Sequence, residues 1–245
     1  MKEYRLVRTH EAWGAADASY YRALPRVADD DPQRRIWRIR EKNFDRLLHL
    51  MSNAMPQTIL DIGAGNGWLS NQLARRGHRV AAVDLLDDAR DGLGAWPYYV
   101  TGFACYQAEF DRLPFDGEQF DWVVFNAALH YSTDLRVTLG EARRVTRPGG
   151  RIVVMDSPFY AEASSGVAMV AERESDFART FGFEQGSRTI GFLTEAELRC
   201  AAREVGLSMR VWEFDMGWIA SLRRAWTRFR IRREPAHMPI VIMET

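Results

Sequence analysis

The sequence lacks a net charge, a set of paired cysteines and any apolar run long enough to cross a membrane. Its 33 basic residues balance 33 acidic ones, whereas a protein that follows a nucleic-acid backbone usually carries a basic excess. Cys105 and Cys200 are the only cysteines, which suits a reducing compartment. The first residues show no apolar signal-peptide region. We therefore expect a cytoplasmic protein that does not bind nucleic acid.

Two further scarcities narrow the chemistry. Lys2 and Lys42 are the only lysines, and all other basic residues are arginine, a usage that a GC-rich bacterial genome would explain. No group of histidine, aspartate and glutamate shows the spacing of metal ligands. The sequence therefore predicts no metal site.

What the chain does contain is an alternation of strand-like and helical patterns. Strands are predicted over residues 58–62, 78–84, 104–109, 120–126 and 151–156, and helices over residues 33–55, 67–76, 134–146 and 194–205. Two more apolar runs, 207–215 and 238–244, read as a closing antiparallel pair. This order is typical of an α/β fold with a doubly wound, mostly parallel sheet and helices on both faces.

We interpret residues 1–245 as one domain with four parts. Residues 1–55 form an N-terminal helical or lid segment, although 1–32 show no regular period, and residues 56–156 form the core. Residues 157–193 fit neither sheet nor covering helix; because they follow a strand's carboxyl end, we expect them to cover the ligand. Residues 194–245 supply the last helix and strands.

A glycine-rich turn follows the first predicted strand in "LDIGAGNG", residues 60–67. A dinucleotide fingerprint would need glycine at the position of Trp68. Asp61, at the mouth of the turn, would repel a pyrophosphate but attract an ammonium group. Asp84 ends the second strand, where an acid accepts hydrogen bonds from ribose hydroxyls. The pattern therefore favours a cationic nucleoside such as S-adenosylmethionine over a dinucleotide.

These residues resemble the class I S-adenosylmethionine-dependent methyltransferases, whose fold is Rossmann-like. "LDIGAGNG" is similar to their D-x-G-x-G-x-G motif, and "AVDL", residues 82–85, to their ribose-binding acid. The segments at 108–131, 141–156 and 192–207 resemble later motifs in the family's order. The resemblance implies a seven-stranded sheet that ends in an antiparallel hairpin, and S-adenosylhomocysteine as a product.

The resemblance also implies roles for individual residues. Gly63 and Gly65 would lie under the methionine part of the cofactor, beside Asp61, and Asn126 would face its methyl end. Asp84 would hold the ribose. The adenine contacts that it implies are Leu85, Phe110 and Glu109, with Asp111 as the alternative to Glu109.

The acceptor side of the predicted site begins after the fourth strand. His130, followed by Tyr131, could remove a proton from a hydroxyl, phenol or amine, or it could be a structural histidine on the pocket floor. "NAAL", residues 126–129, differs from the N-P-P-Y type of motif that resembling enzymes use on nucleobase or amide nitrogens. We therefore expect a small-molecule acceptor, with O-, N- and C-methylation all open.

Two regions outside these motifs have open interpretations. Trp13, Tyr20 and Tyr21 could close over the ligand or anchor the N-terminal segment to the core. Residues 218–233 combine arginines with an apolar face, which could contact a membrane or a phosphorylated substrate, or could simply be a solvated helix.

Three functions stay open on the sequence alone. A methyltransferase is favoured. A noncatalytic module that binds the nucleoside or a partner could keep the same fold. A nicotinamide-dependent oxidoreductase is opposed by Asp61 and Trp68.

Overall fold

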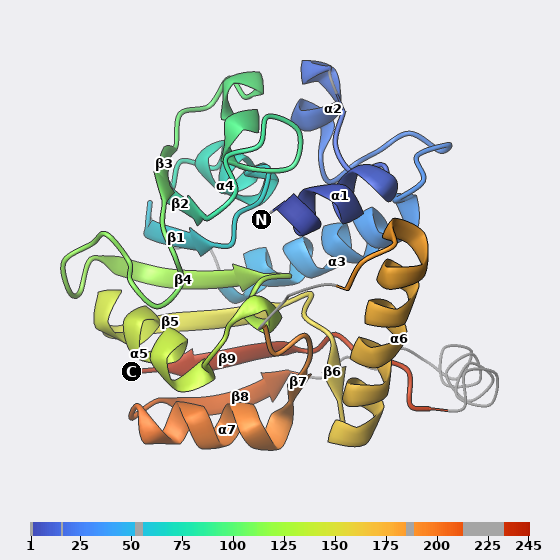
Figure 1. The fold of residues 1–245 in the computed structure, drawn as a ribbon. Helices are drawn as coiled ribbons and strands as arrows, with labels where there is room; N and C mark the ends of the chain where they lie inside the picture. The colour runs from blue at the N-terminus through green and yellow to red at the C-terminus, as the bar shows by residue number, and fades with distance from the viewer. Residues whose placement is uncertain (1, 16, 52–55, 185–188, 213–232) are drawn as a thin grey trace.

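The computed structural model describes residues 2–15, 17–51, 56–184, 189–212 and 233–245. A seven-stranded sheet with the order β3-β2-β1-β4-β5-β9-β8 forms its centre (Figure 1). The strands are β1 (Thr58–Ile62), β2 (Arg79–Asp84), β3 (Ala104–Gln107), β4 (Phe120–Asn126), β5 (Thr146–Met155), β8 (Ser208–Trp212) and β9 (Ile240–Glu244). The order reverses between β1 and β4, which is where ligands bind in open α/β sheets.

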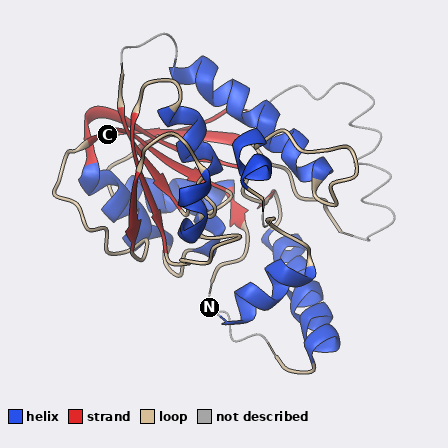
Figure 2. Cartoon of the chain, turned by 90° about the horizontal axis from the view of Figure 1, so that it is seen from above, coloured by secondary structure: helices blue, strands red, loops and turns tan. Residues whose placement is uncertain are grey.

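Helices cover both faces of the sheet (Figure 2). On one face α3 (Arg34–Met51) and α4 (Trp68–Ala74) share a core with Ile59 and Val124. On the other face α5 (Leu135–Val145) and α7 (Glu195–Glu204) pack on a second core. The central strands β1 and β4 are mostly buried because their runs are apolar on both sides, as a covered parallel sheet requires, whereas the edge strand β3 is mostly exposed. The predicted doubly wound α/β sheet is confirmed.

The C-terminal strands close the sheet as predicted. β9 lies between β5 and β8 and is antiparallel to both. All other pairs in this sheet are parallel, from β2·β3 to β4·β5.

β5 begins earlier than its sequence indicates. The predicted turn at 146–150 is a bulge inside the strand, because the β4·β5 register jumps from Phe120↔Thr146 to Trp122↔Arg151. Pro148 cannot donate to a ladder, and Gly149 has a φ of 75°. Residues 146–150 end α5 as expected, but they lie inside β5 and interrupt it instead of preceding it.

Two segments without a predicted pattern contain helices. Residues 1–32 hold α1 (Lys2–His10) and α2 (Ala18–Ala23), and residues 157–193 hold α6 (Ala163–Phe181). Residues 1–32, which show no regular period in the sequence, and residues 157–193, which the sequence left unassigned, are thus partly helical. Most of the stability of a helix in a protein comes from packing on the rest of the molecule, which the period of the sequence alone does not reveal.

The helices α1 and α6 lie at the carboxyl edge of the parallel strands, the side to which the arrow of β4 points (Figure 1). The ring of His10 in α1 contacts that of Phe181 in α6, with centroids 5.6 Å apart. A two-stranded sheet of β6 (Phe159–Tyr160) and β7 (Leu193–Thr194) flanks α6. Over the described residues, no helix is both long and apolar enough to cross a membrane.

The N-terminal aromatic residues anchor their segment to the core. Tyr21 is fully buried, stacks on Tyr98 at 4.7 Å, and its hydroxyl donates to a main-chain carbonyl. Trp13 packs edge-on against Trp37. Of the two interpretations left open by the sequence, the anchoring one fits these contacts.

Candidate functional site

The glycine turn is tied to the neighbouring strand by its own backbone. The amides of Gly63 and Ala64 both donate to the carbonyl of Val83, at 2.8 and 3.0 Å. Gly65 donates its amide hydrogen to Asp84 Oδ2 at 2.8 Å, and Leu86 donates to Asp84 Oδ1 at 2.8 Å. A carboxylate has about four acceptor positions, so Asp84 holds the turn and keeps lone pairs for a ligand.

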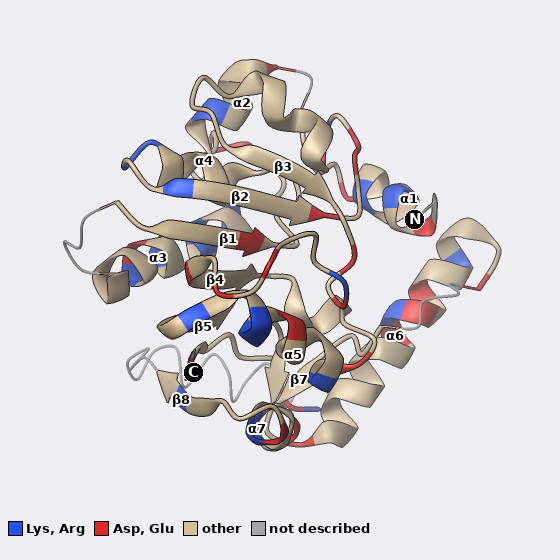
Figure 3. Ribbon diagram, turned by 90° about the vertical axis from the view of Figure 1, so that its left-hand side faces the viewer, with Lys and Arg blue, Asp and Glu red and all other residues tan. Residues whose placement is uncertain are grey.

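Asp61 is a buried carboxyl group with one oxygen unused. Ser70 of α4 donates to its Oδ2 at 2.7 Å, and its buried Oδ1 has no partner among the described residues. Burial raises the pKa of Asp61 to about 7, against the opposing effect of the Ser70 hydrogen bond. Acidic residues close β1 and β2, as the red strand ends show (Figure 3). A cation beside Asp61 would stabilise its ionised form.

Asn126 ends β4 on the same face of the sheet as Asp61. Asp61 pairs in register with Val124, and alternation along β4 places Asn126 on the side of Val124. Asn126 is 8% exposed and its buried Oδ1 accepts no hydrogen bond from any described residue. Asp61 and Asn126 therefore present two unused acceptors at adjacent strand ends.

The backbone beyond β4 and β5 is strained. Ala127 and Asp156, each directly after a strand, have φ values of 54° and 56°. L-residues rarely adopt this left-handed region, and such strain concentrates at functional sites. It persists here because Ala127 donates its amide hydrogen to the carbonyl of Met155 at 2.8 Å, which ties the two strand ends together.

The two glycines of the turn have different surroundings. A Cβ on Gly63 would lie 2.4 Å from the Cβ of Ala128 and 3.2 Å from the Phe110 ring. A Cβ on Gly65 would meet only the main-chain oxygen of Asp91, at 3.9 Å. Gly63 thus allows close packing of the turn against the segment after β4, and Gly65 borders open space.

The residues predicted to contact adenine follow β2 and β3. Leu85 is 38% exposed, and Glu109 and Asp111 are both exposed. Phe110 is half-buried and meets Phe125 edge-on, with ring centroids 6.2 Å apart. These residues are available to a ligand, and the roles of Leu85, Glu109 and Phe110 stay predictions.

His130 lies in a short 3₁₀ turn after β4, at residues Leu129–Tyr131. It is 8% exposed, and its Nδ1 lies 3.2 Å from Ser157 Oγ. Burial, with smaller effects from the charges of Arg173 and Arg40, lowers its pKa to about 3. His130 is therefore a neutral imidazole and, in this state, a weak base.

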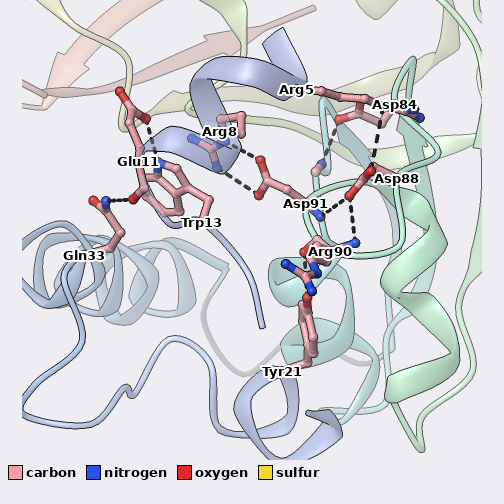
Figure 4. Close-up of polar contacts among 11 residues, drawn as sticks. Arg5, Arg8, Glu11, Trp13, Tyr21, Gln33, Asp84, Asp88, Arg90 and Asp91 are labelled. Carbon is pink, nitrogen blue, oxygen red and sulfur yellow. Dashed lines mark hydrogen bonds and ion pairs between the residues drawn. The ribbon is translucent and has the colours of Figure 1, made fainter. Parts of the chain in front are cut away.

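The helix α1 is fastened over the glycine turn. Arg8 forms a bidentate ion pair with Asp91 (Figure 4). Arg8 Nε donates to Asp91 Oδ2, and Arg8 Nη2 donates to Asp91 Oδ1 at 2.9 Å. Arg5 binds Asp87 at 3.0 Å. The ring of Tyr4 meets that of Tyr131 edge-on, with centroids 5.8 Å apart. No local pattern in the sequence could predict the pairing of Arg8 with Asp91, because the two residues are 83 positions apart.

The described residues contain no group of three or more potential metal ligands. The basic segment at 218–233 lies outside the described residues except for Arg233, which binds Glu172 of α6 at 2.7 Å. The structure therefore does not bear on the membrane or phosphate contact predicted for that segment.

Comparison with known proteins relates part of the chain to a known family. Residues 60–154 match the family described as a methyltransferase domain. A putative sarcosine dimethylglycine methyltransferase from Galdieria sulphuraria shares the fold, with a TM-score of 0.64 over 100% of this chain and 99% of that one, at 14% identity. Residues 60–154 are thus similar to the methyltransferase domain family, and the chain shares the fold of that methyltransferase.

The curated relatives match only part of this chain. The malonyl-[acyl-carrier protein] O-methyltransferase of Salmonella typhimurium is 35% identical over 116 residues, which are 46% of this chain and 43% of that protein. An uncharacterized methyltransferase of Mycobacterium bovis is 37% identical over 46% of this chain and 57% of its own length. The chain thus spans about half the length of the curated relatives that it matches.

The methyltransferase fold also occurs with its cofactor bound. A phosphoethanolamine N-methyltransferase from Haemonchus contortus was solved in complex with S-adenosyl-L-methionine, and its TM-score to this chain is 0.58 over 83% of this chain and 52% of that one, at 14% identity. The residues of the present site fit that cofactor. Unused acceptors on Asp61 and Asn126 suit an ammonium group, and the space beside Gly65 admits a ligand.

Proposed function

We propose that this methyltransferase transfers a methyl group from S-adenosylmethionine to a small-molecule acceptor at the carboxyl edge of its sheet. The observation that carries the proposal is the pair of buried, unused acceptor oxygens on Asp61 and Asn126 beside the glycine turn. A buried acceptor without a donor is costly, and the cofactor's ammonium would satisfy it. A phosphate would be repelled by the same atoms.

In this proposal the chain's own residues divide the work of binding. Asp61 and Asn126 accept hydrogen bonds from the methionine end, and Gly65 leaves room for it. Asp84 uses its remaining lone pairs on the ribose hydroxyls. Leu85 and Phe110 lie against the adenine, and Glu109 accepts from its amino group.

The acceptor would enter between β4, α1 and α6. When bound, the cofactor supplies an electrophilic methyl group with a good leaving group, so that alignment of the nucleophile is the main requirement. Alignment contributes about 7–11 kcal/mol, whereas a general base contributes about 10²–10⁴-fold in rate. His130 and Tyr131 therefore serve first to position the acceptor, and His130 takes its proton when the nucleophile carries one.

The relatives support methyl transfer more strongly than any one acceptor. Several curated relatives are named as malonyl-[acyl-carrier protein] O-methyltransferases. Their similarity covers 46% of this chain or less. The helices α1 and α6 carry none of the motifs on which the family resemblance rests. We therefore extend the cofactor chemistry to this chain, treat residues 1–245 as one catalytic domain, and propose O-methylation as the first reaction to test.

Isothermal titration with S-adenosylhomocysteine, S-adenosylmethionine and NADH tests the proposal. We expect both adenosyl compounds to bind and NADH not to bind. Binding of NADH alone would contradict the proposal and favour an oxidoreductase.

A screen of cell extract with methyl-labelled cofactor then tests turnover. Transfer of label to a small molecule supports the enzyme. Tight S-adenosylhomocysteine binding without any labelled product would favour the noncatalytic module.

A further inference from the structure

Two arginines near the acceptor side have no anionic partner. Arg40 of α3 and Arg173 of α6 each bury an Nε that donates to no acceptor within the described ranges, and neither forms an ion pair there. Arg8, in the same region, is fully paired with Asp91. A partly buried guanidinium with an unsatisfied Nε is unfavourable, so two of them in one region mark a place where an anion belongs.

Arg40 is held rigidly by aromatic rings. Its guanidinium carbon lies 4.8 Å from the ring centroid of Trp37 and 5.0 Å from that of Trp13. The guanidinium carbon of Arg8 also lies over the Trp13 ring, 3.8 Å from its centroid. Stacking of this kind fixes a guanidinium and leaves its N–H groups free to donate. Arg40 is therefore preorganised for a planar oxyanion.

Arg173 approaches the same region from α6. A Cβ built on Gly191 would lie 3.4 Å from Arg173 Nη2. Gly191 in turn donates its amide hydrogen to the carbonyl of His130 at 2.8 Å. The guanidinium of Arg173 thus lies beside the backbone that carries His130. The charges of both arginines act on His130 and lower its pKa.

The nearest acid does not neutralise Arg40. Asp156 is 6% exposed, and its Oδ1 accepts a hydrogen bond from Asn43 Nδ2 at 2.5 Å. Its Oδ2 has no partner among the described residues, and no ion pair joins it to Arg40. Burial raises the pKa of Asp156, and the charge of Arg40 opposes this shift. The region therefore keeps an excess of positive charge.

We propose that Arg40 and Arg173 bind an anionic oxygen group of the methyl acceptor, a carboxylate or a phosphate, beside His130. The proposal rests on the proposed function in naming the ligand as an acceptor, although anion binding itself can be measured without turnover. Arginine forks bind carboxylates and phosphates through paired N–H donors. The substrate class is thus an acidic small molecule.

Two double variants with the same change of charge test the site. R40Q/R173Q removes the two unpaired arginines, and R38Q/R179Q removes two exposed arginines from the same helices, α3 and α6. Thermal unfolding is measured with acetate, with inorganic phosphate and with chloride at equal ionic strength. We expect acetate or phosphate to raise the Tm of the wild type and of R38Q/R179Q by several degrees over chloride. In R40Q/R173Q we expect at least half of this gain to disappear.

Two results would support the proposal of an anion site, and others would overturn it. A selective gain with acetate identifies a carboxylate site, and a selective gain with phosphate identifies a phosphate site. An equal anion effect in both double variants, or none in the wild type, would overturn the proposal.

Titration of S-adenosylhomocysteine into the same proteins separates this proposal from the proposed function. We expect both double variants to bind it within about twofold of the wild type. If S-adenosylhomocysteine does not bind to the wild type, the proposed cofactor site is refuted, whereas the result on anion binding still holds.

Discussion

At the ends of β1 and β4, two buried acceptors have no partner in the described part of the chain, whereas α3 and α6 each leave an arginine donor without one, and Asp156, bonded to α3, leaves a further acceptor. Asp61 and Asn126 supply the acceptors, and Arg40 and Arg173 supply the donors, counted over the described residues. Acceptors select a cation and donors select an anion. The carboxyl edge of the sheet therefore has two halves of opposite chemistry, which suits a cationic methyl donor beside an anionic acceptor.

The two halves also differ in how the chain builds them. The acceptor half comes from the ends of parallel strands that are hydrogen-bonded neighbours, β1 beside β2 and β4. The donor half comes from two helices that reach the edge from opposite ends of the chain, α3 and α6. The comparison teaches that cofactor chemistry follows from the sheet, and acceptor chemistry from what is packed onto its edge.

The largest effect is expected from Asp84→Ala in the acceptor half. The variant loses the acceptor of the Gly65 amide and the two charge-assisted hydrogen bonds predicted for the ribose, each worth about 1.5–3 kcal/mol. We expect the Kd for S-adenosylhomocysteine to rise by about 10²–10⁴-fold, measured by isothermal titration. Asp87→Ala, an exposed acid three residues on, is the control and should bind normally. An unchanged Kd in a folded Asp84→Ala protein would break the assignment of this half.

His130 lies where the two halves meet, and its variant separates binding from transfer. Because burial and the two arginines lower its pKa, we expect His130→Ala to reduce kcat near the low end of the general-base range, by about 10²-fold. The affinity for S-adenosylhomocysteine should hardly change. A near-full rate with the acceptor found in the extract screen would assign His130 a structural role.

The pH dependence of binding tests Asp61 alone. In the ligand-free protein its pKa is raised to about 7 by burial, so the carboxyl is protonated below that pH and attracts an ammonium less. We expect the affinity for S-adenosylhomocysteine to be level above pH 7 and to fall by up to about tenfold per pH unit below it. Binding below pH 7 should release a proton.

Asp61→Asn supplies the control for this profile. It should bind more weakly and lose the decline that begins near pH 7, since the amide does not titrate. If the variant keeps the same decline, another group controls binding.

The smallest effect separates the two glycines. Gly63→Ala and Gly65→Ala both place a side chain at positive φ, at a cost of about 1–2 kcal/mol, but only Gly63→Ala also collides with Ala128. We expect Gly65→Ala to lower Tm by a few degrees and to lose the protection given by S-adenosylhomocysteine. Gly63→Ala should lower Tm more. Equal protection of Gly65→Ala and wild type would show that the ligand does not lie beside Gly65.

The sequence predicted the sheet well because its signals are local. Five strands and the helices between them follow from apolar runs and their period, and the bounds of β1 and β4 agree with residues 58–62 and 120–126. Trp68, which stands where a dinucleotide fingerprint would need glycine, meets Trp37 and Phe44 edge-on in the core. The helices α1 and α6 were missed because their packing partners lie far away in the chain.

The sequence by itself determined the doubly wound sheet, the glycine turn and the acids at the strand ends, since parallel strands necessarily bring their carboxyl ends to one edge. Only the tertiary structure decided that Arg8 and Asp91 fasten α1 over the turn. It also decided that Arg40 and Arg173 keep unpaired donors near His130. The physical reason is that a charge becomes informative only when its burial and its missing partner are known, and both depend on residues distant in the sequence.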